Sequence, residues 1–209
     1  MIDVSWLFFL IASVAVILTP GQDMILVMSR SIAQGALAGV VTAAGVSTGL
    51  LLHTVLATLG VGAIVRASEY LFFAMKIVGA LYLLYLGISL LRVSNAQILT
   101  EDEAARPLRR LYIDGAFSNV ANPKIAVFYF AFLPQFVLPE ARNPTLCIFA
   151  LGASFALLTF LIKGPVGYCS GQLTHWFRRK PAYLAAIYRA SGLVLVGLGI
   201  KLVFEKQAQ

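Results

Sequence analysis

The sequence predicts an all-α integral membrane protein with six transmembrane helices, arranged as two inverted three-helix repeats. The first reason is composition, because 60% of the 209 residues are hydrophobic and only 12% are charged, whereas an ordinary soluble domain is about 25% charged. So few charged side chains cannot cover the surface of a soluble protein, and the chain therefore belongs in a membrane. The second reason is the spacing of long apolar segments. The third is a similarity between the two halves of the chain.

Six apolar segments are long enough to cross a bilayer, which takes about 20 residues of helix. They lie at about 4–28, 36–65, 69–91, 111–138, 145–168 and 185–204. A polar stretch at 92–110 separates the third segment from the fourth. We expect it to be a solvated linker, with room for a short surface helix at about 100–105. The chain is thus one transmembrane domain over 1–209, with a first repeat at 1–91 and a second at 111–209.

The distribution of basic residues predicts the orientation. Arginine and lysine are more frequent in the connections after the first, third and fifth segments than on the opposite side. Connections of this kind lie in the cytoplasm, so both termini are expected outside, although Lys201 and Lys206 oppose this. The net charge of +7 is therefore explained by topology, and we expect no nucleic-acid partner.

The two halves share a pattern that indicates a repeat. The stretches KIVGALYLLYLGISLL, from Lys76, and RASGLVLVGLGIKLV, from Arg189, both contain a cation, then glycine three residues on, then an apolar run and Gly-Ile-x-Leu. The first and fourth segments each contain a proline, Pro20 and Pro123. A repeat with an odd number of spans must insert the second copy upside down, as in many transporters.

The first helix break lies at Pro20 and Gly21, with Gln22 and Asp23 directly after it. Proline removes a helical hydrogen bond, and irregular backbone is tolerated at membrane depth only where it faces protein or a water-filled cavity. We therefore expect a broken helix beside an internal cavity. Asp23 would lie near the start of the resumed helix, where the helix dipole favours a carboxylate. The alternative is that the first span ends at Leu18 and Asp23 caps a surface helix.

The second break contains Asn119, Asn122, Pro123 and Lys124. Lys124 is too far from both ends of its apolar segment for its ammonium to reach either surface. A cation at that depth needs an anionic or carbonyl partner and is a candidate functional residue. The structural alternative is a pair between Lys124 and Asp23 that only holds the two breaks together.

The remaining ionisable residues have both structural and functional interpretations. Lys76 and Arg189 occupy equivalent positions in the two repeats, and Lys76 either reaches the surface or takes part in a site. His53 lies deep in the second segment and is either a packed residue or a proton relay. We expect Asp114 at the membrane interface, and Lys163 as an anchor that extends to the surface from the cytoplasmic end of the fifth segment.

Several function classes lack sequence support. There is no metal-ligand spacing, nucleophile elbow, P-loop or dinucleotide fingerprint, so we expect no enzyme activity, no cofactor and no metal site. Uphill transport would draw on an ion gradient or the membrane potential. We expect Cys147 and Cys169 to be small packing residues, because a redox protein would need a cysteine at each break.

Four stretches in order resemble the LysE/RhtB family of amino-acid exporters over nearly the whole chain. They are TPGQD with Gly35 downstream, KIVGALYLLYLG, FSNVANPKIAVFYFAFLPQFV and RASGLVLVGLGIKL. The family usually has Pro-Gly-Pro where this chain has Pro20-Gly21-Gln22. One proline is therefore replaced by an amide side chain at a position that bears on substrate preference.

The resemblance implies export of amino acids or close derivatives across the bacterial inner membrane by proton-coupled antiport with alternating access. It also implies assembly as a homodimer, while the distribution of basic residues places both termini in the periplasm. We expect Lys124 to bind the substrate carboxylate and Asp23 to bind the ammonium or exchange a proton, while the two repeats rock around the site. The other expected substrate or proton site residues are Asn122, Gln22, Lys76, Asn119 and His53. The alternatives are a transporter of another small solute, such as an organic anion or metal ion, and a membrane subunit that transports nothing.

Overall fold

The computed structural model describes residues 3–19, 21–67, 69–92, 106–179 and 181–204, which consist of helices and short connections. An isolated antiparallel bridge joins Val4 to Val137. The α-helices are α1 (Trp6–Leu18), α2 (Gln22–Gln34), α3 (Ala36–Ala67), α4 (Glu69–Leu91), α5 (Leu108–Val120), α6 (Pro123–Val127), α7 (Pro144–Arg179) and α8 (Pro181–Phe204). A π-helix, η1 (Phe128–Phe132), and a 3-10 helix, η2 (Leu133–Phe136), continue α6.

The all-α prediction is confirmed, and both predicted breaks are present. The first segment divides into α1 and α2, which are bent by 53° relative to each other, and the fourth divides into α5 and α6. By length and composition, Ala36–Gly60 and Pro144–Ser170 are able to cross a membrane, and the bent pair of α1 and α2 gives a third span if it is counted as one. The predicted surface helix at 100–105 lies outside the described residues.

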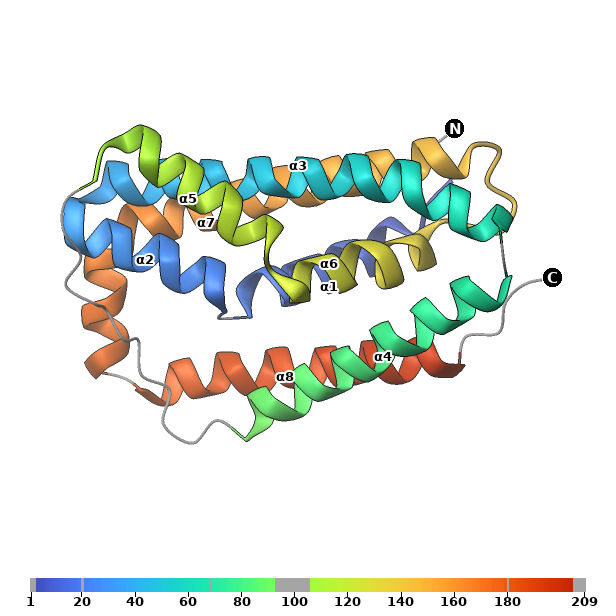
Figure 1. Cartoon of the computed structure of the whole chain (residues 1–209). Helices are drawn as coiled ribbons and strands as arrows, with labels where there is room; N and C mark the ends of the chain where they lie inside the picture. Colours follow the sequence, from blue (N-terminus) through green and yellow to red (C-terminus); the bar gives the residue numbers. More distant parts are fainter. Residues whose placement is uncertain (1–2, 20, 68, 93–105, 180, 205–209) are drawn as a thin grey trace.

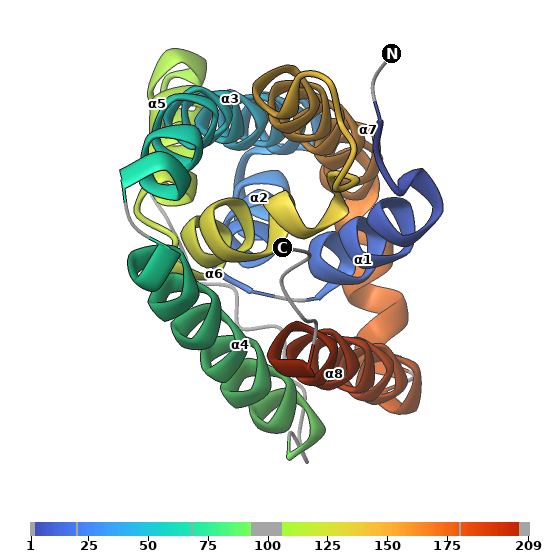
Figure 2. The ribbon, with the colours of Figure 1, turned by 90° about the vertical axis from the view of Figure 1, so that its right-hand side faces the viewer.

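The helices form three layers. In the side view α3, α5 and α7 lie along one side, α4 and α8 run antiparallel along the other, and α1, α2 and α6 lie between them (Figure 1). The end-on view shows the same arrangement, with α1, α2 and α6 in the middle (Figure 2). The start of the described chain and the last turn of α8 lie at the same end of the molecule (Figure 1). The middle layer, which contains both breaks, is therefore enclosed by helices from both halves of the chain.

Glycines allow α3 and α7 to touch along their length. A Cβ atom added to Gly39 would lie 2.7 Å from the carbonyl oxygen of Gly167. A Cβ atom added to Gly152, nearer the other end of the same interface, would lie 2.7 Å from the hydroxyl oxygen of Thr54. Small residues at such positions let membrane helices approach closely enough for backbone packing. Gly39 of α3 and the facing Gly167 and Gly152 of α7 therefore set the distance between these two helices.

Helices α3 and α5 make an even closer contact, which predicts a strong effect for Gly45→Val. A Cβ atom at Gly45 would overlap the carbonyl oxygen of Tyr112, and a backbone oxygen cannot move aside without displacing α5. We expect the free energy of unfolding to fall by about 3 kcal/mol or more. The measurement is the thermal unfolding midpoint of the purified protein. Gly197→Val is the matched control, because nothing lies within 4 Å of a Cβ at Gly197; equal midpoints for the two variants would contradict the prediction.

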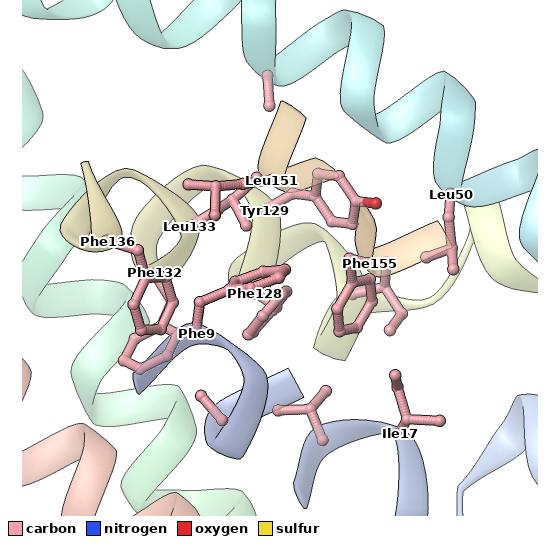
Figure 3. Close-up of a cluster of buried hydrophobic side chains, with 14 of the residues drawn as sticks. Phe9, Ile17, Leu50, Phe128, Tyr129, Phe132, Leu133, Phe136, Leu151 and Phe155 are labelled. Atoms are coloured by element: carbon pink, nitrogen blue, oxygen red, sulfur yellow. The ribbon is translucent and has the colours of Figure 1, made fainter. Parts of the chain in front are cut away.

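An aromatic cluster fills the centre of the bundle between α1, α7 and the segment after the second break (Figure 3). The rings of Phe128 and Phe155 stack with their centroids 4.5 Å apart, and Phe132 packs edge-on against Phe136 at 4.9 Å. Phe9 of α1 packs edge-on against Phe136 at 5.6 Å. This cluster holds α1 against η1 and η2.

Candidate functional site

The two helix breaks lie together in a crossed arrangement. Lys124 at the start of α6 donates hydrogen bonds from Nζ to the carbonyl oxygens of Val16 and Thr19 at the end of α1, both at 3.3 Å. Asn119 at the end of α5 donates from Nδ2 to Oδ2 of Asp23 at the start of α2, at 2.8 Å. The end of each broken helix therefore faces the start of the other.

The sequence explains why Lys124 points at the end of α1. In a continuous helix the carbonyl of Val16 would accept a hydrogen bond from residue 20, but a proline at that position has no N–H to donate. The Lys124 ammonium supplies the missing donor, and its charge lies at a helix C-terminus, where a cation is favoured. Pro20 itself lies outside the described residues. A Cβ atom at the neighbouring Gly21 would lie 3.3 Å from Lys124 Nζ, so the glycine leaves room for the ammonium.

The second break orients Lys124. Asn122 is the N-cap of α6, and its Oδ1 accepts a hydrogen bond from the Lys124 backbone N–H at 3.1 Å. Pro123 occupies the first turn of α6, where a missing N–H costs little. Asn122 is buried, so its cap is protected from competing water. The Asn122-Pro123-Lys124 sequence thus begins a new helix with the lysine directed across to α1.

Asp23 is the only negatively charged group among the described residues at this site. It lies in the first turn of α2 and is 2% exposed, so the alternative in which it caps a surface helix is wrong. Its Oδ2 also accepts from Lys163 Nζ of α7 at 3.4 Å, and its Oδ1 accepts from the Ser118 hydroxyl at 3.5 Å. The lysine that forms the ion pair with Asp23 is therefore Lys163, whereas Lys124 bonds to carbonyl groups.

The expectation that Lys163 reaches the membrane surface is wrong. Its side chain is buried, at 6% relative exposure. The physical reason is that α7 continues to Arg179, well past the predicted end at 168, so Lys163 lies in the interior of a long helix. The site consequently contains two ammonium groups and one carboxylate, all brought from different helices.

Several polar atoms in the interior of the bundle are buried without a hydrogen-bond partner in the described structure. They include Oδ1 of Asn119, Nδ1 of His53, Oγ1 of Thr159 and Oγ of Ser47. His53 Nε2 lies 3.4 Å from the carbonyl oxygen of Asn119, so His53 adjoins the site, and Thr159 precedes Lys163 by about one turn of α7. Buried polar atoms are nearly always paired with protein or water. These atoms can therefore receive water or polar groups of a ligand.

The other predicted site residues lie less centrally. Gln22 is the first residue of α2, and its side chain is exposed. Lys76 is part of α4 in the opposite layer, and its side chain lies outside the described residues. Arg189 of α8 is exposed. Of the sequence-predicted residues, the structure thus brings together Asp23, Asn119, Asn122 and Lys124, with His53 beside them.

The comparisons with known proteins agree with a transport role. A model of the LysE type translocator family matches residues 14–206. The chain belongs to the LysE family. It is 30% identical to a homoserine/homoserine lactone efflux protein of Salmonella typhimurium, over 97% of this chain and 98% of the relative. It is 28% identical to a leucine efflux protein of Klebsiella pneumoniae (95% and 94%) and 31% identical to an uncharacterized membrane protein of Bacillus subtilis (94% and 97%). No solved structure matches.

This LysE-family protein also has a charge cluster centred on α5. Asp114 of α5 contacts three arginines, with N···O distances of 3.6 Å to Arg30, 2.9 Å to Arg106 and 3.1 Å to Arg110. The Asp114 side chain is 17% exposed and that of Arg30 only 4%. Because Arg30 belongs to α2 and Asp114 to α5, the cluster joins the two helices that carry Asp23 and Asn119.

Asp114→Asn is expected to destabilise this LysE-family protein. The substitution removes the carboxylate that the buried Arg30 faces, and breaking a largely buried ion pair costs roughly 2 kcal/mol or more. Arg110→Gln is the matched control: its side chain is 63% exposed, and an exposed pair contributes little. Thermal unfolding of both variants checks the prediction. A midpoint loss in Arg110→Gln as large as that in Asp114→Asn would contradict it.

Proposed function

We propose that this LysE-family protein exports an amino acid or a close derivative across the bacterial inner membrane, and that the substrate binds between the two helix breaks. The observation that carries the proposal is that a buried carboxylate, Asp23, and a half-buried lysine ammonium, Lys124, lie at the starts of the two helices that follow the breaks. An amino acid carries the complementary pair of charges a short distance apart. The names of the homoserine and leucine efflux relatives support the same substrate class.

Each group has a defined role in this proposal. Lys124 binds the substrate carboxylate, with help from free backbone N–H groups at the starts of the broken helices. Asp23 binds the substrate ammonium and takes up a proton when the substrate has left, which makes the transporter an amino-acid/proton antiporter. Asn119 and Asn122 orient these two charged groups, and His53 passes protons toward them. The cycle alternates access to the two sides of the membrane.

The proposal includes two inverted repeats, 1–91 and 111–209, joined by a cytoplasmic linker at 92–110, with both termini in the periplasm. Two contacts between α3 and α7 support it. The same shift in residue number takes Gly39 to Gly152 and Thr54 to Gly167. The Gly39–Gly167 contact and the Gly152–Thr54 contact are therefore equivalent when the two halves are exchanged. A two-fold relation between equivalent units generates contact pairs of this kind. Six spans follow when each broken pair is counted once.

The test is an export assay after dipeptide loading. Cells with and without the protein take up a panel of dipeptides, hydrolyse them, and release free amino acids that are followed by mass spectrometry. We expect faster appearance of a subset of amino acids outside, and loss of this difference on addition of a protonophore. Equal release across the panel, with the protein shown to be in the membrane, would refute amino-acid export. A parallel panel of organic anions would then test the other solute class.

A further inference from the structure

We propose that Lys163 is a resident ammonium that occupies the ammonium site on Asp23 while the substrate site is empty, and that a ligand enters by replacing it. Ligands of this site are then compounds with a free primary ammonium group. The inference rests on the proposed function, because it identifies what the transported amino acid must displace. It assigns a role to a buried cation that the proposed mechanism above does not use.

The contact between Lys163 and Asp23 is buried, but its donor–acceptor distance is long. Both side chains are almost fully buried, and Nζ lies 3.4 Å from Oδ2. Charge-assisted hydrogen bonds of this type are shorter, at about 2.7–2.9 Å. The Ser118 contact to Oδ1, at 3.5 Å, is also long. A free ammonium is not tied to α7 and can therefore approach the carboxylate more closely than Lys163 does.

The structure also offers Lys163 a second set of acceptors. Helical side chains lean toward the N-terminus of their helix, so the Lys163 chain passes over the turn that carries Thr159. Ser47 lies about two turns before Thr54 on α3, and Thr159 about two turns after Gly152 on α7. Because Thr54 and Gly152 touch, Ser47 and Thr159 are placed opposite each other in the same interface. Their hydroxyl oxygens are both buried and unpartnered, and so they can accept the displaced ammonium.

The exchange keeps the charge of the site unchanged. The ligand ammonium replaces the Lys163 ammonium at Asp23, and the ligand carboxylate is balanced by the released Lys163 together with Lys124. A zwitterion can thus enter without leaving an uncompensated charge in a buried place, which would be costly. An N-acetylated amino acid has no ammonium to offer and cannot make the exchange. Discrimination therefore depends on the amino group as well as on the side chain.

The test is chemical complementation of the vacated ammonium position. The full-length protein with Lys163→Ala is purified into lipid nanodiscs, and its unfolding midpoint is measured with n-butylammonium or with n-butanol. We expect n-butylammonium to raise the midpoint by about 3 °C or more, and n-butanol to have no such effect. The double variant Asp23→Asn/Lys163→Ala should not respond, and wild-type protein should respond less than Lys163→Ala, because its own Lys163 competes for Asp23. No selective response of Lys163→Ala would overturn the proposal.

A second variant covers the case in which Lys163→Ala does not fold. Lys163→Gln keeps a hydrogen-bond donor near Asp23 but carries no charge, so n-butylammonium should displace it and raise the midpoint in the same assay. In this variant L-leucine and L-homoserine should also stabilise more strongly than in wild-type protein, whereas N-acetyl-L-leucine should not. If Lys163 has only a structural role, the variant should have a lower unfolding midpoint that no ammonium compound restores. That result would overturn the proposal.

The two proposals fail in distinguishable ways. Amino-acid export by wild-type cells, with no n-butylammonium response in either Lys163 variant, would overturn the displacement of Lys163 and leave the exporter function standing. An n-butylammonium response without export of any amino acid would establish Asp23 as an ammonium site and refute the amino-acid substrate.

Discussion

Asp23→Asn is expected to abolish net amino-acid export while the protein remains in the membrane. The asparagine keeps the size of the side chain and can still contact Asn119, but it has no charge for a substrate ammonium and no proton to exchange. Truncating one partner of a buried charge pair costs several kcal/mol, which corresponds to a loss of roughly 30-fold or more. The measurement is the export rate after dipeptide loading, normalised to the amount of protein in the membrane.

Two further variants separate loss of function from loss of stability. Asp23→Asn leaves the buried Lys163 facing an uncharged side chain, so some destabilisation is expected. Asp23→Asn/Lys163→Gln removes that charge as well, and should recover stability without recovering export. Asp3→Asn is the matched control, since this carboxylate lies near Arg142, away from the breaks, and should export normally. Undiminished export by Asp23→Asn would contradict a role of this carboxylate in coupling proton uptake to export.

Lys124→Met is expected to have the second large effect, on both export and stability. The methionine fills similar space but cannot donate to the carbonyls of Val16 and Thr19. Leaving a buried acceptor unpaired costs about 1–3 kcal/mol, and the substrate carboxylate would lose its cation. We expect a lower unfolding midpoint, together with export reduced to the level of cells without the protein.

Lys124 has two interpretations, as the group that binds the substrate carboxylate and as a structural bridge between the breaks. The export rate of Lys124→Met, compared with two further variants, distinguishes them. Lys124→Arg keeps a charge and donors at the end of α1, and should recover much of the stability. Arg142→Gln, at an exposed position, is the control for loss of a basic residue and should behave like wild type. If the folded fraction of Lys124→Met exports at the normal rate, Lys124 only bridges the breaks and its role in carboxylate binding is wrong.

The helix breaks and most of the residues around them were predictable from the sequence, because their physical causes are local. A proline deprives a carbonyl four residues earlier of its donor wherever the fold places it. An asparagine before Pro123 is a typical N-cap, and a lysine after it needs a partner at that depth. The identity of that partner was not predictable. Both an anion and a carbonyl oxygen satisfy an ammonium, and only the fold decides that Lys124 lies at the end of α1.

Lys163 was misjudged because its depth depends on where a helix ends. Hydropathy falls after 168, and this places the lysine close to an apparent boundary. The helix nevertheless continues through Pro165 to Arg179, since one missing N–H does not end a long helix that is packed on both sides. A local signal was present: Thr159 and Lys163 are polar residues one turn apart on a single helix face. The partner of Lys163 comes from α2, far away in the sequence, and no local pattern reveals it.

The close backbone contacts of the two outer layers limit how the protein can change shape. Helix α3 is in close contact with α7 at two separated points and with α5 at a third, so we expect these three helices to move together as one body. On the other side, Gly87 and Gly192 meet with a Cβ-to-oxygen distance of only 2.8 Å, which makes α4 and α8 a second body. Each body contains helices from both halves of the chain. For the proposed alternating-access cycle, we therefore expect the hinge to run through the middle layer and to cut across both proposed repeats, rather than one intact repeat to rock against the other.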